Sequence, residues 1–202
     1  MGQYYRICYS TNDKDIVITD RRIASDSYVG AKLMEFCWLD DNTSNSILTI
    51  LSKSPARFIV VGDYANSDEW YENLDCSSLE CPSYDDVWGD NVNVTHLPPI
   101  DKNLAIDGKY IVNHSKQTYI DIDDYLKRST KKYSWSNYPL TINPVILLTA
   151  VGNGLGSGDY DYHDPVNVDH VGNWAWDLLE LTEIVPSGYT KYNIEFYENY
   201  KY

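Results

Sequence analysis

The chain lacks any long hydrophobic run. No segment approaches the roughly 20 apolar residues that a membrane-spanning helix needs. The first residues show neither the basic start nor the apolar stretch of a secretory signal. These absences predict a soluble, cytoplasmic protein that contacts no membrane.

Lysine and arginine are missing from two long stretches, between Arg57 and Lys102 and between Lys132 and Lys191, in a chain with a formal net charge of −14. Both stretches are rich in Asp, Glu, Tyr and Trp. Such a surface can attract a basic protein and hold it with aromatic anchors, or it can simply keep the protein solvated. Direct nucleic-acid binding is not expected, because it depends on basic side chains that neutralise phosphates.

Cysteine is scarce and scattered. The chain has four cysteines, which are Cys8, Cys37, Cys76 and Cys81. A zinc site usually needs two close pairs of ligands, and the four histidines supply no second pair that matches Cys76 and Cys81. We expect reduced thiols, while the Cys76/Cys81 spacing leaves room for metal or redox chemistry.

The length of 202 residues and the hydrophobic fraction of 43% fit one domain over residues 1–202. The patterns predict an α+β fold with a mixed or mainly antiparallel sheet and a few short helices. Strands are expected at 3–10, 15–19, 57–61, 109–112, 117–121, 145–150, 174–183 and 192–197. Helices are expected at 30–39, from Thr43 or Ser44 to a stop at Pro55, and at 121–128. Periodicity is weak at 66–101, which predicts an irregular insertion or lid.

The densest glycine cluster begins at Gly152, directly after the apolar run at 145–150. Alternating glycines expose backbone N–H groups and let a ligand approach the main chain closely. The spacing matches neither the dinucleotide fingerprint nor the P-loop. The pattern favours a loop that contacts a ligand or a partner, and a flexible glycine turn is the alternative.

Acidic and histidine side chains follow these glycines. The oxygen ligands of Asp159 and Asp161 have the alternate spacing of calcium loops, but Asp164 and His170 stand where an EF-hand needs glycine and glutamate. We therefore expect no metal and no cofactor.

An enzyme is the alternative interpretation of the same segment. Asp159, Asp161, His163 and His170 could act as acid–base groups with Ser157 as a nucleophile. The nucleophile-elbow pattern G-x-S-x-G is missing, so the sequence does not provide a complete catalytic set.

Two tryptophans, Trp174 and Trp176, are expected on one face of a strand, where they could stack on a base or a sugar ring or equally cover the core. Together with the glycine segment they give the predicted contact residues, which are Asn153, Gly154, Gly156, Gly158, Asp159, Tyr160, Tyr162, Trp174 and Trp176.

Five motifs span the chain: MGQYY at 1–5, VGDYA at 61–65, YIVNH at 110–114, LLTAVGNGLGSGDY at 147–160 and VGNWA at 171–175. In these motifs the chain resembles an uncharacterised group of small proteins of bacteria, prophages and phages. The resemblance implies a location in the cytoplasm of a bacterial host cell. It implies no established activity.

A small acidic accessory protein of a phage or mobile element would fit counter-defence. It could block a basic host protein, or it could sequester a small nucleotide-like ligand. The second mechanism requires basic side chains near the ligand, and the candidates are Arg6, Arg21, Arg22, Lys127, Arg128, Lys131 and Lys132. The leading hypothesis is therefore a non-catalytic binding protein. The alternatives are a metal- or histidine-assisted hydrolase acting on a nucleotide or glycan, and a structural or assembly protein.

Overall fold

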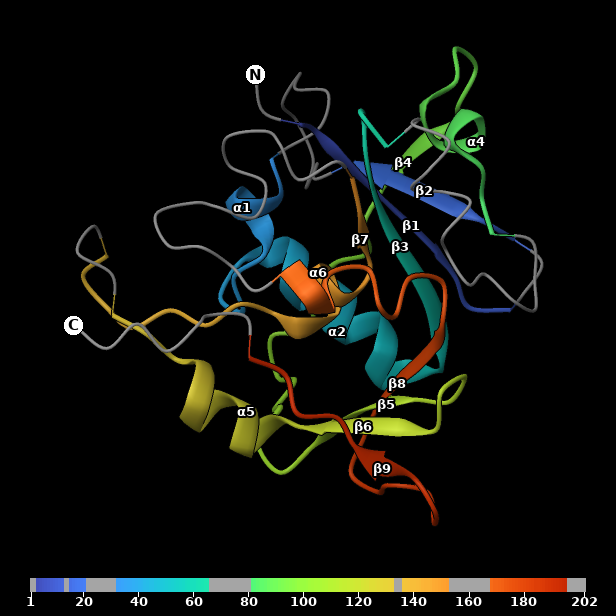
Figure 1. Ribbon diagram of the computed structural model, residues 1–202. Helices are drawn as coiled ribbons and strands as arrows, with labels where there is room; N and C mark the ends of the chain where they lie inside the picture. The colour runs from blue at the N-terminus through green and yellow to red at the C-terminus, as the bar shows by residue number, and fades with distance from the viewer. Residues whose placement is uncertain are drawn as a thin grey trace.

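A computed structural model describes residues 3–12, 15–20, 32–65, 81–132, 136–152 and 168–195. Within these residues the chain forms a mixed, mainly antiparallel sheet with short helices (Figure 1), which confirms the predicted α+β class. No helix in this described part is long and apolar enough to cross a membrane.

The described residues form a nine-stranded sheet in the order β4-β2-β1-β3-β8-β5-β6-β9, with β7 paired to β3 off this path. The strands are β1 (Tyr5–Ser10), β2 (Val17–Asp20), β3 (Ala56–Gly62), β4 (Val94–His96), β5 (Tyr110–Asn113), β6 (Thr118–Asp121), β7 (Ala150–Val151), β8 (Leu178–Thr182) and β9 (Thr190–Lys191). Most neighbours are antiparallel, while β2/β4, β3/β7 and β6/β9 are parallel.

Strand β3 is the centre of the sheet, and each of its residues is buried. Its side chains alternate between two clusters. Phe58 and Val60 join the larger core, whereas Ile59 and Val61 join a smaller cluster on the opposite face. A β-branched run buried on both faces explains why the sequence predicts this strand correctly.

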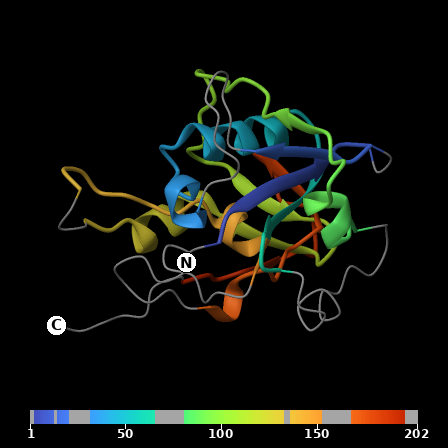
Figure 2. The ribbon, with the colours of Figure 1, turned by 90° about the horizontal axis from the view of Figure 1, so that it is seen from above.

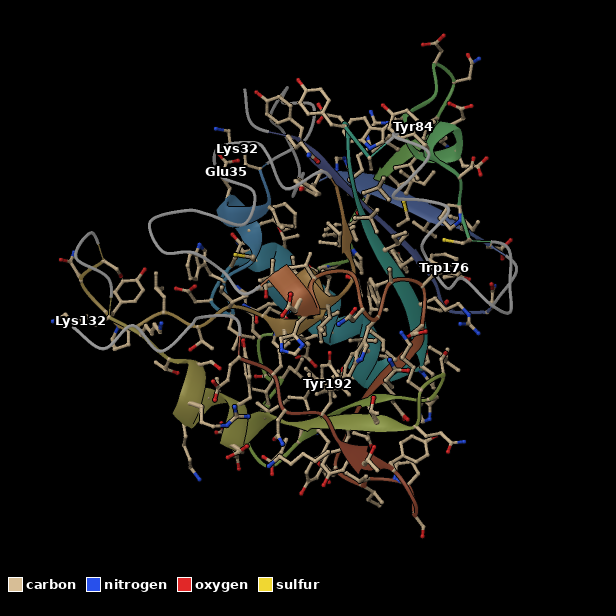
Figure 3. The ribbon with its side chains drawn as sticks, viewed as in Figure 1. Lys32, Glu35, Tyr84, Lys132, Trp176 and Tyr192 are labelled. Atoms are coloured by element: carbon tan, nitrogen blue, oxygen red, sulfur yellow. The ribbon has the colours of Figure 1, made fainter. Side chains whose placement is uncertain are left out.

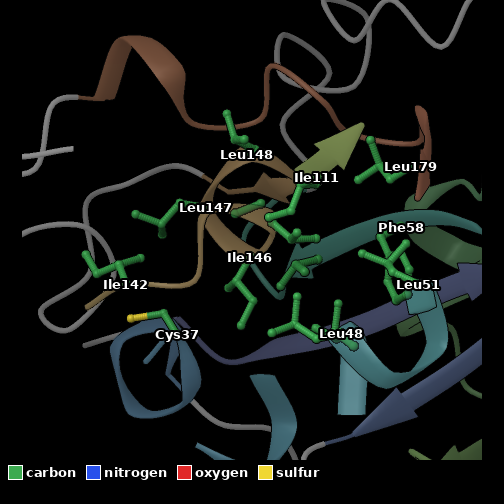
Figure 4. Close-up of a cluster of buried hydrophobic side chains, with 14 of the residues drawn as sticks. Cys37, Leu48, Leu51, Phe58, Ile111, Ile142, Ile146, Leu147, Leu148 and Leu179 are labelled. Carbon is green, nitrogen blue, oxygen red and sulfur yellow. The ribbon is translucent and has the colours of Figure 1, made fainter. Parts of the chain in front are cut away.

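The helices are α1 (Leu33–Phe36), α2 (Asn42–Lys53), α4 (Tyr84–Trp88), α5 (Ile122–Ser129) and α6 (Pro144–Leu148), with a 3₁₀ turn at Val168–His170. In Figures 1 and 2, α1, α2 and α6 gather on one side of the central strands, and α4 lies apart from them. The first three contribute to the larger core, which Figure 4 shows in close-up, and α4 contributes Val87 to the smaller cluster.

Helix α2 begins earlier than the sequence predicts. Asp41 is its N-cap, and the Asp41 carboxylate accepts a hydrogen bond from the Thr43 N–H at 2.7 Å. Thr43 and Ser44, the predicted caps, are buried inside the helix. The prediction was wrong by two or three residues because aspartate caps a helix as well as serine or threonine does.

The apolar run at 145–150 was predicted as a strand and is mainly the helix α6, with only Ala150 and Val151 in β7. Asn143 caps the helix by accepting from the Val145 N–H at 2.9 Å, and Pro144 takes the first helical position, where its missing N–H costs nothing. The helix residues are all buried, and a run that is apolar on all sides carries no periodicity that separates helix from strand.

The predicted strand at 174–183 is also shorter than expected, because β8 begins only at Leu178 and residues 171–176 form turns. The final strand prediction at 192–197 is wrong for residues 192–195, which have no regular structure. β9 instead occupies Thr190–Lys191.

The predicted insertion at 66–101 is only partly within the described residues. Its portion 81–101 contains α4 and β4, and β4 pairs in parallel with β2. This portion is therefore tied to the sheet edge rather than irregular throughout. Residues 66–80, including Cys76, lie outside the described residues.

Candidate functional site

The strands β3 and β7 run parallel, and their carboxyl ends lie side by side. Val60 pairs with Ala150 and Val61 with Val151, so the next residues, Gly62 and Gly152, follow at the same level. Along the β3 edge, the partner changes from β8 at its start to β7 at its end. This change of partner leaves a place at the end of β3 where Gly62 and Gly152 meet.

Two buried side chains from the start of the chain cover these glycines. A Cβ atom built on Gly62 or on Gly152 would lie under 3.0 Å from the Gln3 Oε1 atom, and the one on Gly152 would lie 2.7 Å from the Tyr5 hydroxyl oxygen. Gln3 and Tyr5 are 0% and 1% exposed. A side chain at either position would therefore require Gln3 to move, and Gln3 is fully buried, which favours glycine there.

Asp63 follows Gly62 and is held by the chain start. The Tyr4 N–H donates to the Asp63 Oδ1 atom at 3.1 Å, and the Asp63 N–H donates to the Tyr4 carbonyl at 2.9 Å. Burial raises the pKa of Asp63, against the lowering effect of the backbone hydrogen bonds that it accepts. We call Gln3, Tyr5, Gly62, Asp63 and Gly152 the strand-end cluster.

Exposed and half-buried tyrosines surround Asp63. Tyr4 and Tyr64 are large exposed side chains. The hydroxyl of Tyr84, labelled in Figure 3, donates to the Asp63 carbonyl at 3.0 Å. Burial raises the pKa of Tyr84, and the charges of Asp63 and Asp85 raise it further. The strand ends thus carry the Asp63 carboxylate together with three tyrosines that bind its backbone or follow it in the chain, and such residue types suit polar and cationic contacts.

The chain leaves this place at Gly152 and returns beside α6. The Gly172 N–H donates to the Leu147 carbonyl at 3.0 Å, and the Trp174 N–H donates to the Leu148 carbonyl at 2.7 Å. Gly172 has a positive φ of 77°, and a Cβ atom there would meet the Ala150 carbonyl oxygen at 2.9 Å. The motif at 171–175 is therefore packed against the segment that leads into the glycine-rich stretch.

Most predicted contact residues lie outside the described residues. These are Asn153, Gly154, Gly156, Gly158, Asp159, Tyr160 and Tyr162, and the same holds for the alternative catalytic residues Ser157, Asp161 and His163 and for Asp164.

Trp174 and Trp176 are both described and both buried. Trp174 is 1% exposed and belongs to the larger core, while Trp176 is 5% exposed and belongs to the smaller cluster on the other face. The prediction that they share one strand face is wrong, because a turn with a φ of 60° at Trp176 separates them. Both rings cover hydrophobic core, which is the alternative that the sequence left open.

His170 is the described member of the proposed catalytic set. Its Nδ1 atom lies 2.9 Å from the Tyr192 hydroxyl, which also accepts from the Asn173 amide at 3.2 Å. Tyr192 is labelled in Figure 3 and packs against Trp174 at 5.3 Å between ring centroids. No group of three side chains suited to a metal occurs within the described ranges.

A buried polar network supports the returning chain, and sequence reasoning missed it. The Asp177 carboxylate accepts from the Asn113 amide at 2.8 Å and lies 3.3 Å from the Lys116 ammonium group. Arg57 donates to the Trp176 carbonyl at 2.9 Å. The one sequence signal is the polar end of the YIVNH motif, where asparagine follows two apolar residues at a fully buried position.

The neighbouring histidine His114 is anchored at both ring nitrogens. Its Nε2 atom lies 2.9 Å from the Glu180 carboxylate, and its Nδ1 atom lies 3.2 Å from the Tyr189 hydroxyl. These contacts join β5 to β8 and to the turn before β9. They connect the motif at 110–114 to the sheet rather than to the strand ends.

Several described basic side chains have partners within the chain. Arg6 donates to the Val87 carbonyl at 2.6 Å and stacks on the Trp88 ring at 4.2 Å. Arg128 pairs with Asp124, and Lys191 pairs with the same carboxylate at 2.9 Å. These cations are committed to partners within the chain.

Comparison with known proteins gives no match: no protein-family model matches the chain, and no curated protein and no solved structure is significantly similar to it.

Proposed function

We propose that this protein is a non-catalytic binding protein of the bacterial cytoplasm. Its contact surface combines the strand-end cluster with the glycine-rich segment 152–164 that begins there. The observation that carries the proposal is the partly exposed Asp63, which directly follows Gly62, together with the exposed rings of Tyr4 and Tyr64. Gly62 and Gly152 are themselves buried beneath Gln3 and Tyr5, so they anchor this sheet end rather than form its surface.

The motif arrangement supports this surface. Three of the five motifs, at 1–5, 61–65 and 147–160, contribute residues to the strand-end cluster, and the motif at 171–175 packs against α6 beside it. These segments are far apart in the sequence. Residues of three of the motifs on which the resemblance rests therefore meet at one end of the sheet.

A basic protein is the partner that the charges favour over a nucleotide-like ligand. Phosphate recognition relies on Lys and Arg, but Arg6 and Arg128, two of the candidate cations, are already bound to the protein's own groups. The carboxylate of Asp63 stands among tyrosines instead. Blocking a basic host protein, as a phage or mobile-element counter-defence factor, is therefore the proposed role.

The test is capture from a bacterial lysate with three forms of the protein. One is the wild type, one lacks residues 154–158, and one carries Asp63→Asn with Tyr64→Ala. The control carries Asp107→Asn with Ile184→Ala, which changes one exposed acid and one exposed large side chain elsewhere. Circular dichroism and thermal unfolding establish that each variant is folded.

We expect the wild type and the control to enrich the same basic proteins, and both strand-end variants to lose them. Equal capture by all folded forms would refute the proposed surface. A nucleotide found by mass spectrometry in the wild-type eluate, without a protein, would replace the basic partner by a small ligand at the same place.

A hydrolase is the second candidate, and His170 is the observation that favours it. The Tyr192 hydroxyl orients one of its ring nitrogens, as acid–base catalysis requires. The test is turnover of nucleotide and glycan substrates by the wild type and by His170→Ala, with and without EDTA. Turnover that survives both changes would exclude this version.

A further inference from the structure

A separate cavity lies between the start of α2 and the segment 136–140. Its volume is about 360 Å³, and its lining includes Trp38, Asp40, Asp41, Ser136 and Tyr138. Lys132, which precedes this segment in the chain, lies far from the sheet in Figure 3. None of these residues belongs to the strand-end cluster.

The walls of this cavity are fixed by hydrogen bonds. Trp38 forms an antiparallel bridge with Ile142, and the Leu39 N–H donates to the Thr141 carbonyl at 2.9 Å. On the other wall, the Ser136 hydroxyl donates to the Tyr138 carbonyl at 2.7 Å, a local contact between residues two positions apart. The backbone of Trp38 is therefore held by the segment at 141–142, while the ring of Tyr138 stays exposed.

The charge in the cavity is negative. Asp40 is exposed and forms no ion pair within the described part of the chain, and Asp41 adds a second carboxylate whose Oδ1 atom caps α2. The lining contains neither lysine nor arginine. A cationic group is the complementary ligand, because it would neutralise Asp40 without displacing an internal partner.

The aromatic residues select among cations. Trp38 is buried, whereas Tyr138 is 58% exposed, so Tyr138 is the ring that an entering cation can reach. A planar guanidinium can stack on such a ring and donate two parallel hydrogen bonds to a carboxylate, while an ammonium group acts as a compact, strongly hydrated charge. This combination fits arginine better than lysine.

We propose that the cavity binds an arginine side chain of a basic partner protein. The volume lies at the lower end of the roughly 300–1,000 Å³ of small-molecule sites, and the exposed Asp40 and Tyr138 leave it accessible to a side chain carried by another surface. The inference rests on the proposed function for the class of partner only, since the site itself is distinct from the strand-end cluster.

The experiment measures fluorescence anisotropy of a labelled Gly/Arg peptide and of the same peptide with lysine in place of arginine. The variants are Asp40→Asn, Tyr138→Ala and Tyr138→Phe, and Asp107→Asn is the control for loss of one exposed acid. The form lacking residues 154–158 separates this site from the first one. Free arginine amide serves as the competitor.

We expect Asp40→Asn to weaken binding of the arginine peptide by about tenfold, the scale of one charge-assisted contact. Tyr138→Ala should weaken it by about fivefold, with Tyr138→Phe close to wild type because the ring is kept. Asp107→Asn and the deletion form should bind within about twofold of wild type.

Three results would overturn the inference. Equal binding of the lysine peptide would remove the selection for guanidinium. An equal loss with Asp107→Asn would reduce the effect to general negative charge. Displacement of the peptide by free arginine amide at the peptide's own affinity would indicate a small-molecule site rather than a protein partner. Loss of host-protein capture by the deletion form, with peptide binding intact, would support both proposals independently.

Discussion

Substitution of Gly62 by alanine tests the packing at the strand ends. Gly62 is the last residue of β3 and lies opposite Tyr5 in the β1/β3 register. Its φ is not positive, so an alanine backbone would itself be acceptable and could stabilise by about 0.4–1 kcal/mol through the unfolded state. The new Cβ atom, however, would overlap the Gln3 amide oxygen and lie 3.1 Å from the Tyr5 ring.

The overlap outweighs the backbone gain. Gln3 is fully buried, so its side chain has little room to move away. Overpacking of a well-packed interior costs about 1–3 kcal/mol, and subtracting the backbone gain leaves a net destabilisation of about 1–2 kcal/mol for Gly62→Ala. Gln3→Ala removes the overlapping oxygen. In the Gln3→Ala background, Gly62→Ala should lower the free energy of unfolding by less than about 0.5 kcal/mol. The coupling energy between the two substitutions is then on the order of 1–2 kcal/mol.

Urea unfolding followed by far-ultraviolet circular dichroism measures the four free energies of unfolding in this cycle. Gly108→Ala is the control, because a Cβ atom there meets nothing within 4 Å and its cost comes from a φ of +69°. That cost should be the same in the wild-type background and in the Gln3→Ala background. Additive effects of Gly62→Ala and Gln3→Ala, to within about 0.5 kcal/mol, would refute the packing argument.

Buried and paired groups give three further predictions. Lys191 and then Arg128 hold the pKa of Asp124 below its ordinary value of 3.8. The carboxylate therefore stabilises the fold above that value, and this contribution is lost as pH falls through the lowered pKa. The difference in urea midpoint between wild type and Asp124→Asn should be present at about pH 7 and vanish near about pH 2, and a difference that stays constant would contradict the prediction. Burial raises the pKa of the Cys8 and Cys37 thiols, so iodoacetamide at about pH 8 should label them only after unfolding, as peptide mapping would detect. Asp177→Ala should lower the free energy of unfolding in urea by about 2–3 kcal/mol, because the buried Asn113 amide loses its acceptor and the half-exposed Lys116 loses its counter-charge. A decrease of less than about 1 kcal/mol would show that the network is dispensable.

Local patterns predict β1, β2, β3, β5 and β6 well, and they predict α6 and the later strands less well. The run at 57–61 is β-branched and buried on both faces, and the hairpin β5/β6 alternates clearly, so each strand is close to its predicted position. The run at 145–150 has the same apolar character but is mostly helical. The only local signals for a helix at this run are Asn143, which caps α6, and Pro144 at its first position. The stabilisation of the helix start that they provide comes from a few backbone hydrogen bonds.

The sequence marks the glycine-rich stretch after 152 as a candidate but does not give the geometry of the strand ends. Nothing local indicates that Gln3 lies over Gly62 and Gly152. These contacts join residues about 60 and 150 positions apart and arise from strand order, which a single sequence does not encode in its periodicity. The turn at Trp176 was missed for the same reason, since the Arg57 and Phe58 contacts that hold it come from β3.

The two buried polar groupings of this protein differ in a way that bears on function. In the network around Asp177, donor and acceptor groups satisfy one another: the Asn113 amide, the Lys116 ammonium and the Asp177 carboxylate close on themselves across β5 and the turn before β8. Such a network fixes a turn and offers little to a partner. At the strand ends, by contrast, the Gln3 and Tyr5 oxygens lie over two buried glycines at the carboxyl ends of two parallel strands. The groups next to them, Asp63 with the exposed rings of Tyr4 and Tyr64, remain open to a partner, which is why the proposed contact surface lies there rather than at the Asp177 network.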